Sequence, residues 1–463
     1  MMKRMLCILL ACFLCVPLAA CPAGEPSVTT GSTTAATTTA TKPQAPATQP
    51  LSLTADAVYS TVGKTVTFTA TGGAEGEYSF TLSDEDAVSL KTQDGGKLTV
   101  RLAAEGELIV RVARGSENAE SSVRVFPRGK SNYEFSDPLI YYHGRVGAPG
   151  ASSVQFRSVA NGFEVCFFGT ALKMKMTGSA SRYSVFVDGA SDPEENIINI
   201  GTDGTDGIFT LASFEEAGVH RVKVLKRNQE DLGINNFFSL TVEDGGLLDP
   251  TPQYTLKMEI YGDSITCGHG AMRGTAGDSM SLEVDNGLGT YAALAAMELG
   301  AEFRVFSKSG LGLYTNPYGS TTWLKDIYGD VSVGSREAYA AEKYIPDIIV
   351  INIGTNDIWT GAAGSAGNTP FNAEDFKNAY LQFVRNLAAR YEGKDIQFFC
   401  CSGMMENGLA PFVADIVATL EAEGFDIHAV TLNRTTSNGH PLITEHRTGA
   451  NILVGAIDEA NAE

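Results

Sequence analysis

The chain has 463 residues and a formal net charge of −20, from 34 basic and 54 acidic side chains. Its length exceeds that of one ordinary domain, so we expect several folded units. So large a negative charge repels phosphate backbones, which argues against nucleic-acid binding but identifies no substrate.

Residues 1–20 have the organisation of a processing signal. Two basic residues precede the apolar run Met5–Phe13, and Leu18-Ala19-Ala20 leads to Cys21. The run is too short to span a bilayer, and the order of basic, apolar and small residues is that of a secretory signal. The last four residues resemble the lipobox of bacterial lipoproteins, which implies lipid on the Cys21 thiol. We therefore expect an extracytoplasmic protein anchored by lipid at the bacterial cell surface; the alternative is an ordinary signal peptide with an incidental cysteine.

Residues 21–50 are rich in threonine, alanine and proline and contain no aromatic residue. Such a composition cannot bury a core, so this segment is predicted to be a linker.

The cysteines beyond the linker do not suggest a disulfide framework. They are Cys166, Cys267, Cys400 and Cys401, and the last two are neighbours in a predicted strand. Neighbouring strand residues point to opposite faces, so we expect buried thiols. Beyond the predicted signal there is no C-x-x-C pair or histidine-rich cluster. No metal or organic cofactor is therefore expected.

Residues 51–126 alternate between apolar and polar side chains. Val66, Phe68 and Ala70 share one face of a predicted strand, and threonines occupy the other. The pattern predicts a small β-sandwich, which resembles the bacterial immunoglobulin-like spacer domains.

Residues 127–249 are also rich in strands, such as Phe163–Phe168, but have longer connections. We expect a jelly-roll β-sandwich. Asp203 and Asp206 lie in a glycine-rich turn sequence, which explains them better than a calcium site does.

Residues 250–463 change to an α/β rhythm, with continuous apolar strands typical of a parallel sheet covered on both faces. The pattern predicts a doubly wound, flavodoxin-like domain. The predicted strands are Lys257–Tyr261, Glu302–Phe306, Asp347–Ile353, Ile396–Cys401 and Ile427–Leu432. The predicted helices are Asn286–Leu299, Ala373–Tyr391, Pro411–Glu423 and one from Ile443 onward.

Polar residues follow four of these strands. Ser264 ends Gly-Asp-Ser, Gly310 lies in Ser-Gly-Leu-Gly, Asn356 lies in Gly-Thr-Asn-Asp, and His440 lies in Gly-His-Pro. The carboxyl ends of parallel strands meet at one edge of the sheet, where ligands bind. These four residues are therefore expected to meet in one site.

The four motifs match, in order, the blocks of the SGNH (GDSL-type) hydrolase superfamily. Together with the preceding β-sandwich, they make the chain similar to the acetyl xylan esterases of carbohydrate esterase family 2. The resemblance implies that Ser264 is the nucleophile and His440 its general base. It also implies an oxyanion hole formed by the N–H groups of Ser264 and Gly310 and the Asn356 side-chain amide. Some members of the family that the chain resembles work with a Ser-His dyad alone.

One position departs from that pattern. The superfamily usually has aspartate two residues before the histidine, and this chain has Asn438. Losing the carboxylate can cost about 10⁴ in kcat when histidine takes the wrong tautomer. The Asn438 side-chain oxygen or a backbone carbonyl could accept the His440 Nδ1–H instead. We therefore expect an active enzyme, whose rate can be lower than that of an enzyme with the full triad.

The surrounding residues have supporting roles in this hypothesis. Asp263 and Asp357 are expected to fix loops by hydrogen bonding. Trp359 is the preferred platform for a sugar ring, ahead of Trp323. His143, His269 and His446 are interpreted as structural or surface residues.

The sequence therefore predicts a serine esterase that removes O-acetyl groups from a polysaccharide of the xylan or glucomannan type. Its expected partners are an acetylated polysaccharide or oligosaccharide and, through the lipid anchor alone, a membrane. One alternative is an esterase or thioesterase acting on an envelope glycan or a short acyl chain. Another is a surface glycan-binding protein whose catalysis is impaired.

Overall fold

The computed structural model describes residues 49–148, 150, 152–201, 207–249, 254–275, 277–363, 367–405, 408–435 and 439–462. The predicted signal, most of the linker, Cys21, Asp203, Asp206 and Asn438 lie outside these ranges. Among the described residues, no helix is both long and apolar enough to cross a membrane.

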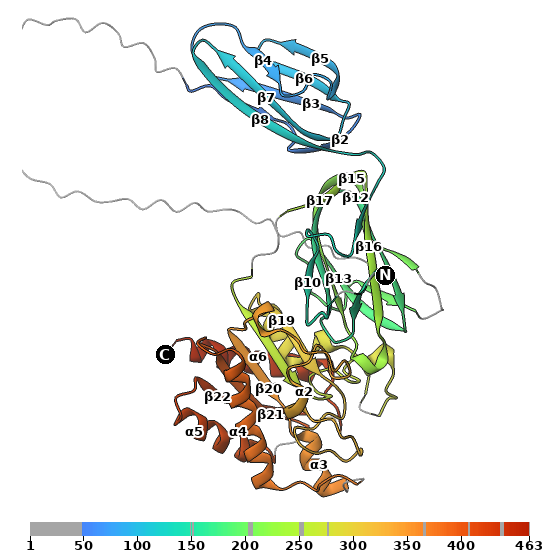
Figure 1. The fold of residues 1–463 in the computed structure, drawn as a ribbon, viewed down its shortest axis with the longest axis vertical. Helices are drawn as coiled ribbons and strands as arrows, with labels where there is room; N and C mark the ends of the chain where they lie inside the picture. The colour runs from blue at the N-terminus through green and yellow to red at the C-terminus, as the bar shows by residue number, and fades with distance from the viewer. Residues whose placement is uncertain are drawn as a thin grey trace, which may run out of the picture. The chain divides into compact units, whose positions relative to one another are not determined.

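The first folded part consists of two four-stranded sheets, drawn in blue in Figure 1. Their strand orders are β1-β3-β6-β5 and β2-β8-β7-β4. The bounds are β1 (Ser52–Ala55), β2 (Tyr59–Thr61), β3 (Thr65–Thr71), β4 (Ser79–Leu82), β5 (Val88–Asp94), β6 (Lys97–Leu102), β7 (Gly106–Arg114) and β8 (Glu117–Phe126). In β3, Val66, Phe68 and Ala70 are buried between polar neighbours. The predicted alternation is thus confirmed.

The second part is a nine-stranded sheet in which β11-β16-β12-β15-β13-β14 form the main path. Its strands are β9 (Lys130–Glu134), β10 (Tyr141–His143), β11 (Val154–Phe156), β12 (Gly162–Gly178), β13 (Ser181–Val187), β14 (Ile197–Ile200), β15 (Gly207–Lys226), β16 (Asn235–Glu243) and β17 (Gly246–Leu248). Strand β12 joins two stretches that the sequence pattern separates, Phe163–Phe168 and Leu172–Met176. Register shifts against β15 near Gly169 and Leu172 interrupt the regular pairing without ending the strand.

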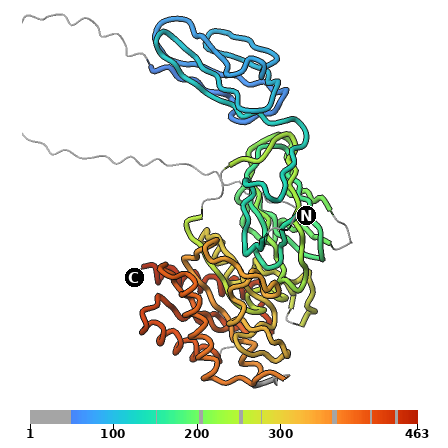
Figure 2. The backbone as a smooth tube through the Cα atoms, viewed as in Figure 1, coloured from blue at the N-terminus to red at the C-terminus, as the bar shows by residue number. Residues whose placement is uncertain are grey.

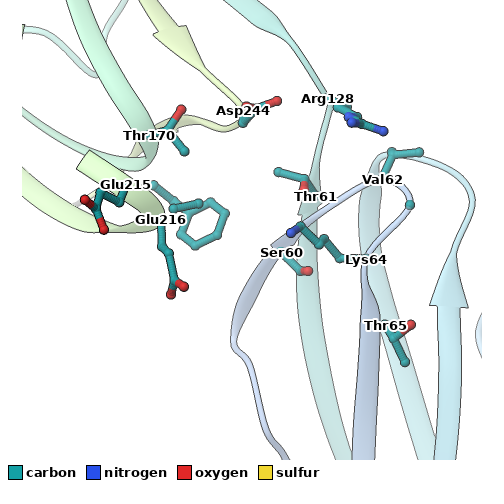
Figure 3. A pocket seen from close by; sticks show the side chains of 13 residues that line it. Ser60, Thr61, Val62, Lys64, Thr65, Arg128, Thr170, Glu215, Glu216 and Asp244 are labelled. Carbon is teal, nitrogen blue, oxygen red and sulfur yellow. The ribbon is translucent and has the colours of Figure 1, made fainter. Parts of the chain in front are cut away.

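The two β parts meet through a small aromatic cluster. Phe126, Cys166 and Leu248 are buried, and Tyr59 and Phe168 pack against them. A pocket of about 640 Å³ lies beside this cluster (Figure 3). Its lining includes Glu215 and Glu216 from β15, with Lys64 and Arg128 from the loops after β2 and β8.

The third part is the predicted parallel sheet, in the order β19-β18-β20-β21-β22 (Figure 1). The strands are β18 (Lys257–Gly262), β19 (Glu302–Ser307), β20 (Ile348–Asn352), β21 (Gln397–Met404) and β22 (Ile427–Arg434). All five predicted strands are present within a few residues of the expected bounds. The order is the flavodoxin-like one, in which the crevice lies between the first and third strands. Here those are β18 and β20.

Helices pack against this sheet in two separate apolar cores. Figure 2 traces the backbone of this part in yellow to red. The helices are α1 (Tyr291–Glu298), α2 (Leu324–Ile327), α3 (Thr355–Ala363), α4 (Ala373–Arg390), α5 (Ala410–Glu421) and α6 (Ile443–Ala460). One apolar core contains α1 and α6 residues with Cys401, and the other contains α4 and α5 residues with Cys400. All four cysteines beyond the linker are buried free thiols, as predicted.

The helix expected over Asn286–Leu299 is shorter than predicted. Residues Gly287–Gly289 form a 3-10 turn, and the Asn286 side chain accepts a hydrogen bond from the Gly289 N–H at 3.2 Å. Two glycines weaken a helical turn, and asparagine favours a local side-chain bond over helix continuation. The α-helix therefore begins only at Tyr291.

A buried ion pair joins the second and third parts. Arg145, after β10, donates to Glu259 Oε1 of β18 at 2.9 and 3.1 Å. It also donates to the carbonyls of Tyr328 and Asp330 at 2.6 and 2.7 Å. Both charged side chains are 1% exposed. The pair thus fixes a loop of the β part against the strand that leads to Ser264.

Candidate active site

Ser264 lies in the turn that follows β18 and is 4% exposed. The turn is tight because the Cys267 N–H donates to the Asp263 carbonyl, and the His269 N–H to the Ser264 carbonyl, each at 3.0 Å. Position 262 must be glycine, since a Cβ there would lie 2.1 Å from Thr266 Oγ1. The Gly-Asp-Ser sequence thus places a serine at the sheet edge.

Ser264 opens into a pocket of about 400 Å³. Five residues singled out in the sequence line it: Ser264, Gly310, Asn356, Trp359 and His440. Six further residues complete the lining: Asp231, His269, Ser309, Tyr318, Thr355 and Met405. The four motif residues follow four different strands, and they meet in one pocket, as predicted for residues at the carboxyl ends of parallel strands. Their chemical roles stay predictions.

Asn356 lies in the first turn of α3 and is 3% exposed. Its Nδ2 donates to the Leu311 carbonyl at 2.9 Å and lies 3.4 Å from Asp263 Oδ2. Gly310 precedes Leu311 and has a φ of 78°, which favours glycine. The amide of Asn356 is therefore held between the loops of Gly310 and Ser264, where it can donate to an oxyanion.

Two buried carboxylates support these loops. Asp263 Oδ1 accepts the Ile265 N–H at 3.0 Å. Asp357 accepts the N–H groups of Leu313, Tyr314 and Thr315 at 2.8 to 3.0 Å. Burial raises the pKa of Asp263 to about 7 and that of Asp357 to about 6. Through these hydrogen bonds both aspartates fix loops, as predicted from the sequence.

His440 belongs to the last of the four motifs and lies just before α6. Burial, together with His269 and Arg273, lowers the pKa of His440 to about 4, and Asp285 opposes this shift. Arg273 Nη2 donates to the His440 carbonyl at 2.8 Å. A neutral imidazole here can accept a proton from serine at ordinary pH. The expected support from Asn438 lies outside the described residues.

A second imidazole lies beside the first. The rings of His269 and His440 have centroids 5.2 Å apart and planes at 84°. His269 Nδ1 lies 3.2 Å from Asp285 Oδ1, and Asp285 is fully buried. His269, expected to be a structural or surface residue, thus lines the pocket, and its closeness to Ser264 in the sequence is the only signal of that position.

The second β part also reaches the pocket, which no sequence signal predicted. Gln229 Oε1 accepts the Ser309 N–H at 2.7 Å, and Asp231 pairs with Lys308 at 3.0 Å. Asp231 belongs to the turn η1 (Glu230–Leu232) and lines the pocket. The loop that carries Gly310 is therefore held on its amino-terminal side by residues from a different part of the chain.

Two exposed aromatic side chains lie at the pocket. Trp359 on α3 is 41% exposed, and Tyr318 is 60% exposed. Trp323 is not among the residues that line the pocket. His446 is buried, and its Nδ1 accepts the Tyr291 N–H at 3.3 Å, while buried His143 bonds Glu164 at 3.0 Å. These two histidines have the structural role expected of them.

No group of three or more candidate metal ligands occurs among the described residues. Ser264 and His440 line the same pocket, and serine with a nearby imidazole is the combination that nucleophilic catalysis by serine uses.

Two family matches cover most of the second and third parts. Residues 142–252 match the carbohydrate esterase 2 N-terminal domain, and residues 260–436 match the GDSL-like Lipase/Acylhydrolase family. Neither match reaches the two sheets formed by β1–β8.

Related proteins agree with these matches. The chain is 27% identical over 336 residues to the cellulase/esterase CelE of Acetivibrio thermocellus, which covers 69% of this chain but only 39% of CelE. It is 28% identical over 312 residues to an acetylxylan esterase / glucomannan deacetylase of Cellvibrio japonicus, covering 66% of this chain and 82% of that protein.

A solved structure is similar over the same region. It is that of a family two carbohydrate esterase from Clostridium thermocellum in complex with cellohexaose, with 25% identity and a TM-score of 0.63. The match covers 70% of this chain and 99% of that one. This chain therefore has a GDSL-like lipase/acylhydrolase domain behind a carbohydrate esterase 2 N-terminal domain, and its relatives are family 2 carbohydrate esterases.

Proposed function

We propose that this protein is a serine esterase that removes O-acetyl groups from a polysaccharide of the xylan or glucomannan type. One observation carries the proposal: Ser264, Gly310, Asn356 and His440 come from four strand ends and line a single pocket. The relatives named as acetylxylan esterase and glucomannan deacetylase support the choice of substrate.

The proposed reaction begins with attack by Ser264 Oγ on the acetyl carbonyl, while His440 accepts the serine proton. The resulting oxyanion accepts hydrogen bonds from the N–H groups of Ser264 and Gly310 and from Asn356 Nδ2. His440 then gives its proton to the departing sugar oxygen, which leaves an acetyl-enzyme. Water repeats the sequence on that intermediate, releases acetate and restores the Ser264 hydroxyl.

The shape of the pocket suits a substrate that extends beyond it. The exposed faces of Trp359 and Tyr318 are available for stacking on sugar rings. An acetyl group can then enter toward Ser264 while the glycan chain remains outside. A family two esterase from Clostridium thermocellum was solved with cellohexaose, which supports a glycan ligand for this site.

Acetate release tests the proposal. Acetylated xylan, acetylated glucomannan, an acetylated envelope glycan and p-nitrophenyl acetate would be offered to the wild-type protein and to Ser264→Ala. We expect acetate from xylan or glucomannan with the wild type and none with the variant. Turnover of the envelope glycan or only of simple esters or thioesters would support the first alternative.

The second alternative, a glycan-binding protein with impaired catalysis, is favoured by Asn438 and by the lowered pKa of His440. Binding of these polysaccharides without any Ser264-dependent acetate release would establish it in place of the esterase.

The remaining organisation of the chain is also part of the proposal. Residues 1–20 would be a lipoprotein signal, Cys21 the lipidated residue at the cell surface, and residues 21–50 a tether. The β1–β8 region (51–126) would be immunoglobulin-like, which its two packed four-stranded sheets support, and 127–249 a jelly roll. Incorporation of labelled palmitate into the wild type but not into Cys21→Ser tests the anchor.

A further inference from the structure

The active-site pocket contains an imidazole–carboxylate pair that the proposed reaction has not used. His269 lines the pocket with Ser264 and His440. Its Nδ1 lies 3.2 Å from Asp285 Oδ1 and 3.4 Å from Oδ2. Asp285 is fully buried and also accepts the Gly270 N–H at 2.8 Å. The carboxylate is thus fixed in place and points at a pocket residue.

His440 needs a negative charge nearby when it accepts the Ser264 proton. The imidazolium forms in a buried place, and position 438 carries asparagine where the superfamily usually has a carboxylate. Arg273, which donates to the His440 carbonyl, adds positive charge to the same surroundings. A serine hydrolase with these features requires another source of stabilisation.

We propose that Asp285 and His269 together replace the triad carboxylate, with His269 as a positioning residue that transmits the charge of Asp285 to His440. In this arrangement His269 is neutral and donates its Nδ1–H to Asp285. The hydrogen bond polarises the ring, which meets His440 edge to face with centroids 5.2 Å apart. The negative charge of Asp285, behind the polarised ring, favours a positive charge on His440 through space. The inference rests on the proposed esterase function.

The charges around His440 allow the sign of the effect to be stated. Besides burial, His269 and Arg273 lower the pKa of His440. The other titratable groups nearby are His446 of α6 and Asp231, which lines the pocket. Burial lowers the pKa of His446 to about 3, so His446 stays neutral at ordinary pH. Asp285 raises the pKa of His440. Removing its charge must therefore lower that pKa further.

Titration of His440 by NMR, in wild type and Asp285→Asn, tests the inference without any need for turnover. The chain has six histidines, so single substitutions can assign the signals. We expect the pKa of His440 to fall in Asp285→Asn and to stay unchanged in Asp278→Asn. Asp278 is the matched control because its carboxylate accepts hydrogen bonds from Thr275 in the same loop and is not one of the groups that shift the pKa of His440. An unchanged His440 pKa in Asp285→Asn would overturn the inference.

Kinetics supply the second test. With p-nitrophenyl acetate, Asp285→Asn and His269→Gln should lower kcat about 10-fold to 100-fold with little change in KM, less than the roughly 10⁴-fold loss of a directly bonded triad carboxylate. The glutamine keeps a donor for Asp285 and removes the ring. In a His440→Ala background, His269→Gln should cause no further loss, because His269 acts through His440.

The outcomes separate the two proposals. A large further loss from His269→Gln in the absence of His440 would show that His269 is itself a proton acceptor, which contradicts the inference. Absence of Ser264-dependent turnover in the wild type would contradict the esterase proposal. The NMR titration would still decide whether Asp285 acts on His440.

Discussion

At the scale of single residues, the site depends on burial as much as on residue identity. Ser264, Asn356 and the two supporting aspartates are all nearly or fully buried. Burial disfavours charge, so Asp263 and Asp357 hold their protons to higher pH than usual and His440 loses its proton at lower pH. At neutral pH His440 is therefore uncharged, Asp263 is about half protonated, and Asp357 is mostly ionised.

The pH dependence of activity should report the state of His440. The base works only when neutral, and its pKa is lowered to about 4. Because protonation occurs below the pKa, the acid limb of kcat/KM should fall near pH 4 rather than near the ordinary histidine value of about 6.5. A pH profile between 3 and 9 with p-nitrophenyl acetate checks this. A limb near 6.5 would show that His440 is not held in this environment.

Asn356→Ala should remove one oxyanion donor. Its Nδ2 lies in the loop junction between Gly310 and Ser264, and losing one such donor typically costs about 10²–10³ in kcat. We expect KM to change little, since the donor acts on charge that develops in the transition state. Steady-state kinetics measure the effect, with Trp359→Ala as the control. That variant should raise KM for polysaccharide and leave kcat for p-nitrophenyl acetate unchanged.

At the scale of elements, the oxyanion loop depends on a turn from another part of the chain. Gln229 holds Ser309 and Asp231 pairs with Lys308, immediately before Gly310. Lys226 is buried at the end of β15 and donates to the carbonyls of Arg157, Asn228 and Gln229 at 2.8 to 3.3 Å. The second β part is thus a structural component of the pocket.

Gln229→Ala should therefore lower kcat although Gln229 contacts no reacting atom. Losing the bond to Ser309 frees the loop and misplaces the Gly310 N–H, for which we expect about a 10-fold loss, since small misplacements can cost up to 10². Asp231→Asn should cost less than Gln229→Ala, because the exposed pair of Asp231 with Lys308 contributes little to holding the loop. Equal kcat values for Gln229→Ala and wild type would show that the loop is fixed without Gln229.

The elements also show what sequence patterns can and cannot predict. The five parallel strands were predicted because buried strands are continuously apolar. Ser264, Gly310 and Asn356 could be predicted as site residues because they come after the carboxyl ends of these strands. The length of β12 was not predicted, because the alternation of apolar and polar residues does not show that a strand continues through a register shift. Gln229 was not predicted either, since long-range packing alone brings it to the loop of Gly310. The pairing of His269 with Asp285 was missed because the sequence does not show which side chains meet around a turn.

At the scale of the whole molecule, one buried ion pair links the second β part to the catalytic sheet. Arg145 and Glu259 are both almost fully inaccessible, and Tyr391 also donates to Glu259 at 2.7 Å. A buried charge left without its partner is costly, whereas an exposed pair is not. The pair is therefore a point at which the two parts share their stability.

Arg145→Met should lower the free energy of unfolding by about 3–5 kcal/mol, because Glu259 would be left buried and unpaired. The double variant Arg145→Met, Glu259→Gln should recover part of the loss. Arg111→Ala breaks an exposed pair with Glu120 and should cost less than about 1 kcal/mol. Chemical denaturation measures all three. A small loss for Arg145→Met would mean that the parts are held together by other contacts.

The most direct test of the whole account is mass spectrometry of the protein mixed rapidly with an acetylated substrate and quenched. The account predicts a transient acetyl group on the peptide that contains Ser264, and no such group in Ser264→Ala. Turnover without that acetyl group, or an acetyl group that forms elsewhere and persists in Ser264→Ala, would contradict it.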